Sequence, residues 1–143
     1  PKPQTGLQEA AREARYRLLC SACERLGAHH LMTAHTADDQ AETLFMRLRR
    51  SAFTGLGGMQ SVRNIAAGTG DPILLHRPLL RWRRGELRRY ALDHGLPVMD
   101  DPSNDDHKFE RVRVRALLAA LEQQDLLSTD ALCALADQAP PES

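Results

Sequence analysis

The sequence predicts an α/β fold with a parallel sheet. Segments with helical periodicity alternate with short apolar segments in the order helix, strand, helix, loop, strand, helix. The apolar run Leu31–Ala34 leads directly into a helical segment with acidic residues at its start, as expected where a buried strand is followed by a helix. Apolar residues make up 42% of the 143 residues, which is sufficient for a hydrophobic core. The chain is therefore one α/β domain or part of one.

Helices are expected at residues 6–27, 37–50, 83–94, 109–122 and 128–137, and strands at 29–34 and in "ILLHRPL", residues 73–79. The first helix carries an apolar stripe that includes Leu18 and Leu26. The segment "SAFTGLGGM", residues 51–59, is a glycine-rich loop without the G-x-x-x-x-G-K-S/T pattern of a P-loop. The segment "PVMDDPSNDDHKF", residues 97–109, indicates a short extended piece followed by an acidic, turn-rich loop.

The number of predicted strands is too small for a complete doubly wound sheet. An α/β domain also rarely begins with a helix that no strand precedes. We therefore expect the N-terminal strands of the sheet to be missing from these 143 residues. The strand that would pair with them is then left with an exposed edge.

Composition and charge argue against several classes of protein. No apolar run is long enough to span a bilayer and no signal peptide is evident, which favours a soluble cytoplasmic protein without a membrane partner. The 19 basic and 19 acidic residues balance, which is not the overall signature of a nucleic-acid binder. Arginines nevertheless cluster in three places; each cluster alone favours a solvated helix face, but together on one side they would form an RNA-facing surface. The clusters lie at residues 47–50, 81–89 and 111–115.

The three cysteines do not indicate a disulfide framework or a zinc site. An odd count argues against a set of disulfides. Cys20 and Cys23 have C-x-x-C spacing, but they lie in the middle of a predicted helix, and no second close pair completes a tetrahedral site. Buried free cysteines are common, so a structural role is favoured.

The most informative segment is His35–Thr43. It places Asp38, Asp39 and Glu42 at the start of a predicted helix, where residues three or four positions apart share a face. Acidic residues in a first turn also have a structural explanation, because they complement the exposed N–H groups and the helix dipole. Three carboxylates directly after a strand nevertheless lie where open α/β sheets bind ligands. Carboxylates suit an ammonium or a magnesium ion, since both are hard cations.

Five motifs in series resemble one family. They are "GLQEAAREARYRLL", "TAHTADDQAETLFMRL", "GLGGM", "HRPLL" and "LPVMDDPSN", between about Gly6 and Leu121. The chain resembles the tRNA(Ile)-lysidine synthases, a branch of the PP-loop ATP pyrophosphatases. The resemblance implies a Rossmann-like domain of the adenine-nucleotide alpha-hydrolase type. Residues 1–122 would be the C-terminal part of that domain, and residues 123–143 a helical linker or tail.

The resemblance also implies a reaction. ATP adenylates the C2 carbonyl oxygen of the wobble cytidine in an isoleucine tRNA, the ε-amine of lysine attacks C2, and AMP leaves. The implied cofactors are ATP and Mg2+, and the implied partners are tRNA(Ile) with a CAU anticodon, L-lysine and a second copy of the chain in a homodimer. The family's Ser-Gly-Gly-x-Asp-Ser loop, which holds the ATP phosphates, is absent from these residues. We therefore expect this polypeptide alone to be inactive on ATP.

Site residues follow from the resemblance position by position. Asp39, Glu42 and Arg111 match catalytic positions, and the two carboxylates are also the candidate magnesium ligands. Two positions depart from the family pattern: Thr36 replaces a second histidine, and Val112 replaces an asparagine. Substrate- or nucleotide-binding roles fall on His35, Asp38, Arg77, Asp101 and Asn104.

Two alternatives remain open from the sequence. The first is a PP-loop enzyme that inserts sulfur into a tRNA cytidine, since such enzymes share the acidic segment. Some of them hold an iron–sulfur cluster with cysteines, and their second cysteine pair follows the stretch that corresponds to "LPVMDDPSN". This stretch contains no cysteine, and "DDPSN" is the lysidine pattern. The second alternative is a non-catalytic remnant that contacts tRNA through its arginines.

Overall fold

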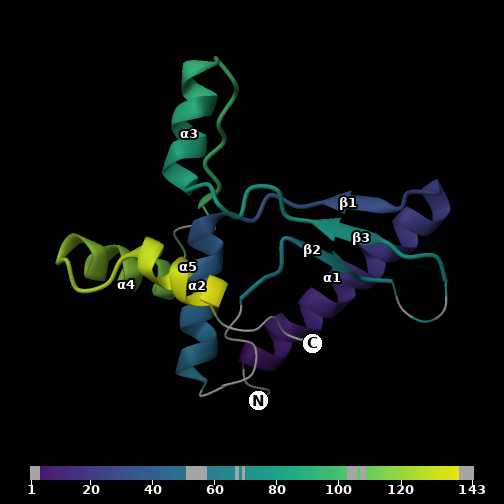
Figure 1. Cartoon of the computed structure of the whole chain (residues 1–143), viewed down its shortest axis with the longest axis horizontal. Coiled ribbons are helices and arrows are strands. Elements are labelled where there is room, and N and C mark those ends of the chain that lie inside the picture. The colour runs from purple at the N-terminus through teal and green to yellow at the C-terminus, as the bar shows by residue number, and fades with distance from the viewer. Residues whose placement is uncertain are drawn as a thin grey trace. The chain divides into compact units, whose positions relative to one another are not determined.

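The computed structural model describes residues 4–50, 58–66, 68, 70–102, 106 and 109–138 (Figure 1). The chain divides into two units, Pro1–Thr33 with Ser61–Arg77, and Ala34–Gln60 with Pro78–Ser143. Each unit is built from segments that lie far apart in the sequence. Asn104, one of the predicted site residues, and residues 51–57 of the glycine-rich loop lie outside the described residues.

The first unit contains helix α1 and a three-stranded sheet in the order β1-β3-β2. Strands β1 (His30–Met32) and β3 (Leu74–His76) are parallel, which confirms the predicted parallel pairing. Strand β2 (Val62–Asn64) pairs antiparallel with β3 and was not predicted. The Asn64 side chain accepts hydrogen bonds from the backbone N–H groups of Ala66 and Ile73, at 3.0 and 3.3 Å, and so helps return the chain into β3. The sheet is thus mixed.

Helix α1 (Gln4–Leu26) contacts the sheet unit through its cysteines. The Cys20 thiol donates to the carbonyl oxygen of Ile65 at 3.3 Å, and Cys23 is buried. Burial, followed by the charges of Cys23 and Glu24, raises the pKa of the Cys20 thiol, as suits a structural cysteine.

Two leucines of the apolar stripe predicted on α1 are exposed. Leu18 and Leu26 are 72% and 81% exposed, whereas Cys23 on the same helix is buried.

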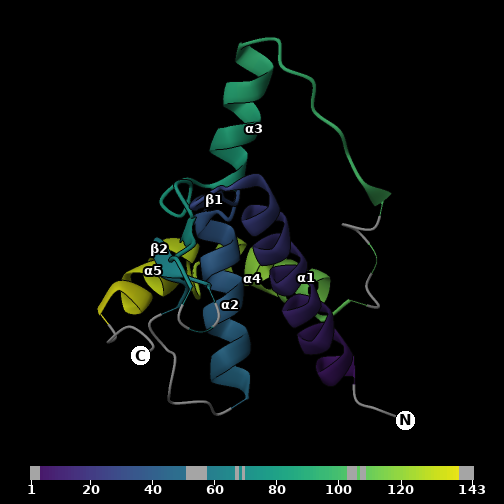
Figure 2. The same cartoon turned by 90° about the vertical axis from the view of Figure 1, so that its right-hand side faces the viewer.

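Four helices make up the regular structure described in the second unit. They are α2 (Ala37–Arg49), α3 (Arg84–Asp93), α4 (Glu110–Gln123) and α5 (Thr129–Gln138). Helices α4 and α5 pack against α2 (Figure 2), and Leu44 at the centre is fully buried. The core cluster is formed by Ala41, Leu44, Met46, Val114, Leu118, Leu132 and Ala136. The five helices that the structure describes each begin and end within two residues of their predicted bounds.

Helix α3 differs from the other helices of its unit. The structure describes all of its residues, and none of them is buried. It extends away from α2, α4 and α5 (Figures 1 and 2). Its attachment is concentrated at its first turn, where Arg83 and Arg84 contact carboxylates of the other helices.

A buried glutamine holds the loop after residue 57 to α2. The Gln40 side chain donates to the Met59 carbonyl oxygen at 3.0 Å and accepts from the Met59 N–H at 2.7 Å. Gly58 adopts φ +65, and a Cβ there would lie 2.8 Å from the Gln40 side chain. Glycine is therefore required beside this contact. No helix among the described residues is both long and apolar enough to traverse a lipid bilayer.

Candidate carboxylate–arginine site

The first carboxylate of the site, Asp39, serves the fold and the site with different oxygens. Its Oδ2 accepts from the backbone N–H of Thr36 at 2.8 Å and from the Thr36 hydroxyl at 2.9 Å, while Thr36 Oγ1 accepts from the Asp39 N–H at 3.3 Å. These contacts form a capping box at the start of α2. The Oδ1 atom of Asp39 instead lies 2.9 Å from Nη2 of Arg84. The structural explanation of this acidic residue, helix capping, is therefore confirmed, and its second oxygen is left to pair with Arg84.

Asp38 joins α2 to the start of α3. Its Oδ2 accepts from the backbone N–H of Arg84 at 2.5 Å, and its Oδ1 lies 3.4 Å from Nε of Arg83. The first residues of a helix have N–H groups without partners inside the helix. Asp38, which belongs to α2, therefore accepts a hydrogen bond from one of these N–H groups at the N-terminus of α3. In turn, the Ala37 N–H at the start of α2 donates to the carbonyl oxygen of Trp82 at 2.9 Å.

Glu42 is the most deeply buried charge of the site, with 1% of its surface exposed. Three guanidinium groups surround its carboxylate, those of Arg84 at 3.3 Å, Arg111 at 3.6 Å and Arg115 at 3.4 Å. A buried carboxylate is tolerated only when it is paired, and these arginines supply the pairing.

Arg111 and Arg115 lie one helical turn apart on α4 and reach α2 from the same face. Arg111 is also fixed by a hydrogen bond of 2.9 Å from its Nη2 to the hydroxyl of Thr43, and its Nη1 lies 3.9 Å from Oδ1 of Asp39. The core residues Val114 and Leu118 hold α4 in place, so these two arginines are firmly positioned.

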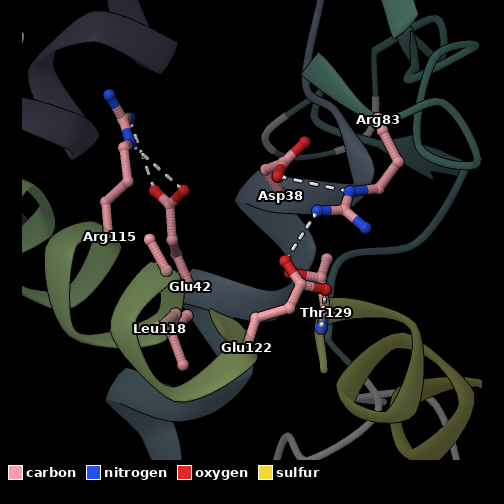
Figure 3. Close-up of a pocket in the computed structure, with 8 residues that line it drawn as sticks. Asp38, Glu42, Arg83, Arg115, Leu118, Glu122 and Thr129 are labelled. Carbon is pink, nitrogen blue, oxygen red and sulfur yellow. Dashed lines mark hydrogen bonds and ion pairs between the residues drawn. The ribbon is translucent and has the colours of Figure 1, made fainter. Parts of the chain in front are cut away.

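A pocket of about 120 Å³ opens beside these charges. Figure 3 shows Arg115 and Glu42 on one side of it and Arg83 and Asp38 on the other. Arg83 also lies 3.2 Å from Oε2 of Glu122. The remaining lining residues are Leu118, Ala119 and Thr129. The pocket thus combines carboxylates and guanidiniums with a small apolar surface.

The pKa of Asp39 is lower than usual. Burial alone would raise it, but the Thr36 N–H, the Arg84 charge, the Thr36 hydroxyl and the Arg111 charge together outweigh the burial. Asp39 therefore carries its negative charge throughout the neutral range.

The sequence is also similar to known proteins. The family model of the PP-loop domain matches residues 2–122. The chain belongs to this family. Every residue of the carboxylate–arginine site up to Glu122 lies in the matched region of the PP-loop domain.

Curated relatives of this PP-loop chain carry one name, tRNA(Ile)-lysidine synthase. The protein from Novosphingobium aromaticivorans is 50% identical over 117 residues, which are 81% of this chain and 35% of the relative. The protein from a Bradyrhizobium species is 46% identical over 84% of this chain and 32% of the relative, and that from Methylobacterium nodulans is 44% identical over 88% and 36%. The chain thus spans about a third of the length of these relatives.

Four of the predicted site residues of the PP-loop chain come together, namely Asp38, Asp39, Glu42 and Arg111. His35 precedes α2 and is half-buried. Arg77 belongs to the first unit, where it is 2% exposed and donates to the Tyr16 hydroxyl at 3.4 Å. Asp101 is exposed and is not among the described residues that line the pocket.

Sequence reasoning did not identify Arg84 and Arg115 as site residues. Both belong to arginine clusters that the sequence assigned to solvated faces or to an RNA surface. In the described part of the chain, many clustered arginines instead pair with carboxylates of their own unit, such as Arg88 with Asp100 at 2.9 Å. One signal was available for Arg115. It lies four residues after Arg111 and therefore on the same face of a helix, so it could be expected to reach the same carboxylates.

Asp39 and Glu42 are already paired with arginines, which bears on the predicted magnesium site. Guanidinium nitrogens already contact both carboxylates, and a magnesium ion would require several free oxygens in octahedral geometry. Among the described residues, no three His, Cys, Asp or Glu side chains are arranged to hold a metal ion. The described side chains therefore do not fit a magnesium site as they stand.

Proposed function

We propose that this chain forms part of the active site of a tRNA(Ile)-lysidine synthase, which ligates lysine to the wobble cytidine of tRNA(Ile) at the expense of ATP in the cytoplasm. The observation that carries the proposal is the position of Asp39 and Glu42, two carboxylates on one face of α2 that share Arg84, with Glu42 also lining the pocket. Membership of the PP-loop family and the shared name of the relatives support it. That name also favours lysine ligation over sulfur insertion.

In this proposal Asp39 and Glu42 bind the ε-ammonium group of lysine. Glu42 is almost completely buried and Asp39 is largely so, and charge-assisted hydrogen bonds in such surroundings are stronger than in water. Because a carboxylate with a lowered pKa is a weak base, Asp39 is suited to hold the ammonium in place and not to deprotonate it.

Arg111 orients both carboxylates, and Arg115 orients Glu42. Each guanidinium contacts Glu42, and Arg111 is fixed further by Thr43. With α4 anchored in the core, these contacts keep the carboxylates in one geometry before the substrate arrives, which lowers the entropic cost of binding. ATP supplies the AMP leaving group in the reaction, and we assign none of the described side chains to its phosphates.

The test measures transfer of labelled lysine to a tRNA(Ile) transcript with a CAU anticodon, in the presence of ATP, by the full-length protein that contains this chain. The wild type is expected to incorporate lysine, and Asp39→Asn to lower turnover by orders of magnitude. The matched control is Asp93→Asn, which alters an exposed aspartate of α3 that lies 4.0 Å from the exposed Arg89 of the same helix. No incorporation by the wild type overturns the proposed function; full activity of Asp39→Asn removes Asp39 from the site.

A further inference from the structure

Arg84 occupies the place that the proposed function gives to the substrate. Its Nη2 atom lies 2.9 Å from Oδ1 of Asp39 and 3.3 Å from Oε2 of Glu42, so that one guanidinium nitrogen bridges the two carboxylates. An ammonium group bound to the same oxygens would overlap it. We propose that Arg84 is an internal competitor of the cationic substrate, which displaces the guanidinium when it binds. This inference rests on the proposed function.

Among the three arginines at Glu42, Arg84 differs in the helix that carries it. Arg111 and Arg115 project from α4, which the core holds in place. Arg84 lies at the first position of α3, a fully described helix without a buried residue, while the exposed fractions of the three side chains are similar. Its guanidinium can therefore move into solvent without disturbing packed side chains.

The main chain of Arg84 has a separate attachment. Its backbone N–H donates to Asp38 Oδ2 at 2.5 Å, and this bond does not involve the guanidinium. The side chain can rotate away from Asp39 and Glu42 while Asp38 continues to hold the start of α3. Displacement thus requires a change of rotamer, not the detachment of a helix.

The charge balance of the site favours exchange of one monovalent cation for another. Asp39 and Glu42 face the guanidiniums of Arg84, Arg111 and Arg115. When an ammonium replaces the Arg84 guanidinium, the number of charges at the carboxylates is unchanged. A divalent cation would instead add a charge to a site in which three guanidiniums already face two carboxylates. Exchange with a singly charged amine leaves the net charge of the site as it is.

When a competitor occupies the site in part of the molecules, the apparent dissociation constant for the substrate is the intrinsic constant divided by the fraction of molecules in which the site is free. Because Arg84 is partly exposed, its contact is a weak one, and its removal is expected to lower the apparent dissociation constant for lysine by about threefold to tenfold.

The experiment compares Arg84→Ala, Arg84→Lys and the control Arg88→Ala in the full-length protein that contains this chain. Arg88 lies on the same helix and pairs with the exposed Asp100. Calorimetric titration with L-lysine measures binding without turnover, and steady-state assays give KM for lysine and for ATP. We expect Arg84→Ala to lower the dissociation constant and KM for lysine by about threefold to tenfold, with KM for ATP unchanged. Arg84→Lys keeps the charge and is expected to stay closer to the wild type, and Arg88→Ala to match it.

Unchanged or weaker lysine binding by a folded Arg84→Ala protein overturns the inference. A fall in kcat with KM for lysine unchanged also overturns it, because Arg84 would then be a positioning residue. Circular dichroism establishes whether the variant is folded, and if it is not, the Arg84→Gln protein takes its place in the titration. A wild type that binds lysine but transfers none to tRNA overturns the proposed function, while the titration still decides the role of Arg84.

Discussion

Oδ2 of Asp39 accepts two hydrogen bonds from Thr36, one from the backbone N–H at 2.8 Å and one from the hydroxyl at 2.9 Å. The residue that departs from the family's histidine thus fixes the rotamer of the carboxylate that we propose to bind substrate. A role in orienting Asp39 does not require an imidazole.

Replacing Thr36 should reveal this role. Thr36→Ala removes the capping hydroxyl and is expected to lower the free energy of unfolding by about 1 kcal/mol. The substrate-facing oxygen of Asp39 also loses its fixed orientation, so KM for lysine should rise. Urea denaturation and the lysine-transfer assay measure both effects. Thr36→Ser keeps the hydroxyl and serves as the control; equal losses in both variants would contradict the capping role.

The lowered pKa of Asp39 predicts a dependence of stability on acid. A carboxylate whose pKa is depressed by folding stabilises the folded state fully above the unfolded-state pKa of about 3.9, and this contribution is lost as the pH falls from there through the folded-state pKa. Urea denaturation over the acidic range should therefore show a steeper loss of stability in the wild type than in Asp39→Asn. Parallel curves for the two proteins would contradict the lowered pKa.

Glu42→Gln tests the buried carboxylate. The amide removes the carboxylate that pairs with Arg115 and leaves Arg111 only its longer contact with Asp39, and we expect a loss of about 2 kcal/mol in unfolding free energy. This figure is below that for a fully buried pair because both arginines are about one third exposed. The control is Glu13→Gln, on the exposed surface of α1. A variant as stable as the control would show that Glu42 is not needed to balance these arginines.

The core of the second unit predicts a contrast within one helix. Leu44 is fully buried, whereas Leu48, one turn later, is 43% exposed. Leu44→Ala should lower the free energy of unfolding by about 2–5 kcal/mol, and Leu48→Ala by much less, since it leaves a smaller cavity. Thermal unfolding monitored by circular dichroism compares the two variants. Similar losses would contradict the packing of α4 and α5 on α2.

Local rules were sufficient for much of the fold. Helical periodicity and the acidic first turn placed α2 to within a residue, and the apolar run before it placed β1. The same spacing rule brought Asp39 and Glu42 to one face, which the structure confirms. Strand β2 was missed because all three of its residues are exposed and carry no alternating pattern.

The partners of the site residues depend on tertiary packing and were not accessible to the same rules. Arg84 and Arg115 meet Glu42 across 42 and 73 residues of sequence. Nothing in an arginine cluster distinguishes a guanidinium that binds RNA from one that pairs with a carboxylate of its own fold. As a result, the sequence predicted that Asp39 and Glu42 bind a cation, but it did not predict that Arg84 of the same chain already pairs with them.

The central claim, that Asp39 and Glu42 recognise the ε-ammonium group, is tested most directly by comparing L-lysine with L-norleucine. Norleucine has the same main chain and an aliphatic side chain that lacks the terminal ammonium. Calorimetric titration of the full-length protein with each amino acid gives the ratio of the two affinities. We predict a strong preference for lysine in the wild type and its loss in Asp39→Asn, because the site then lacks one of its two charges. A preference for lysine that survives unchanged in a folded Asp39→Asn protein would contradict the account.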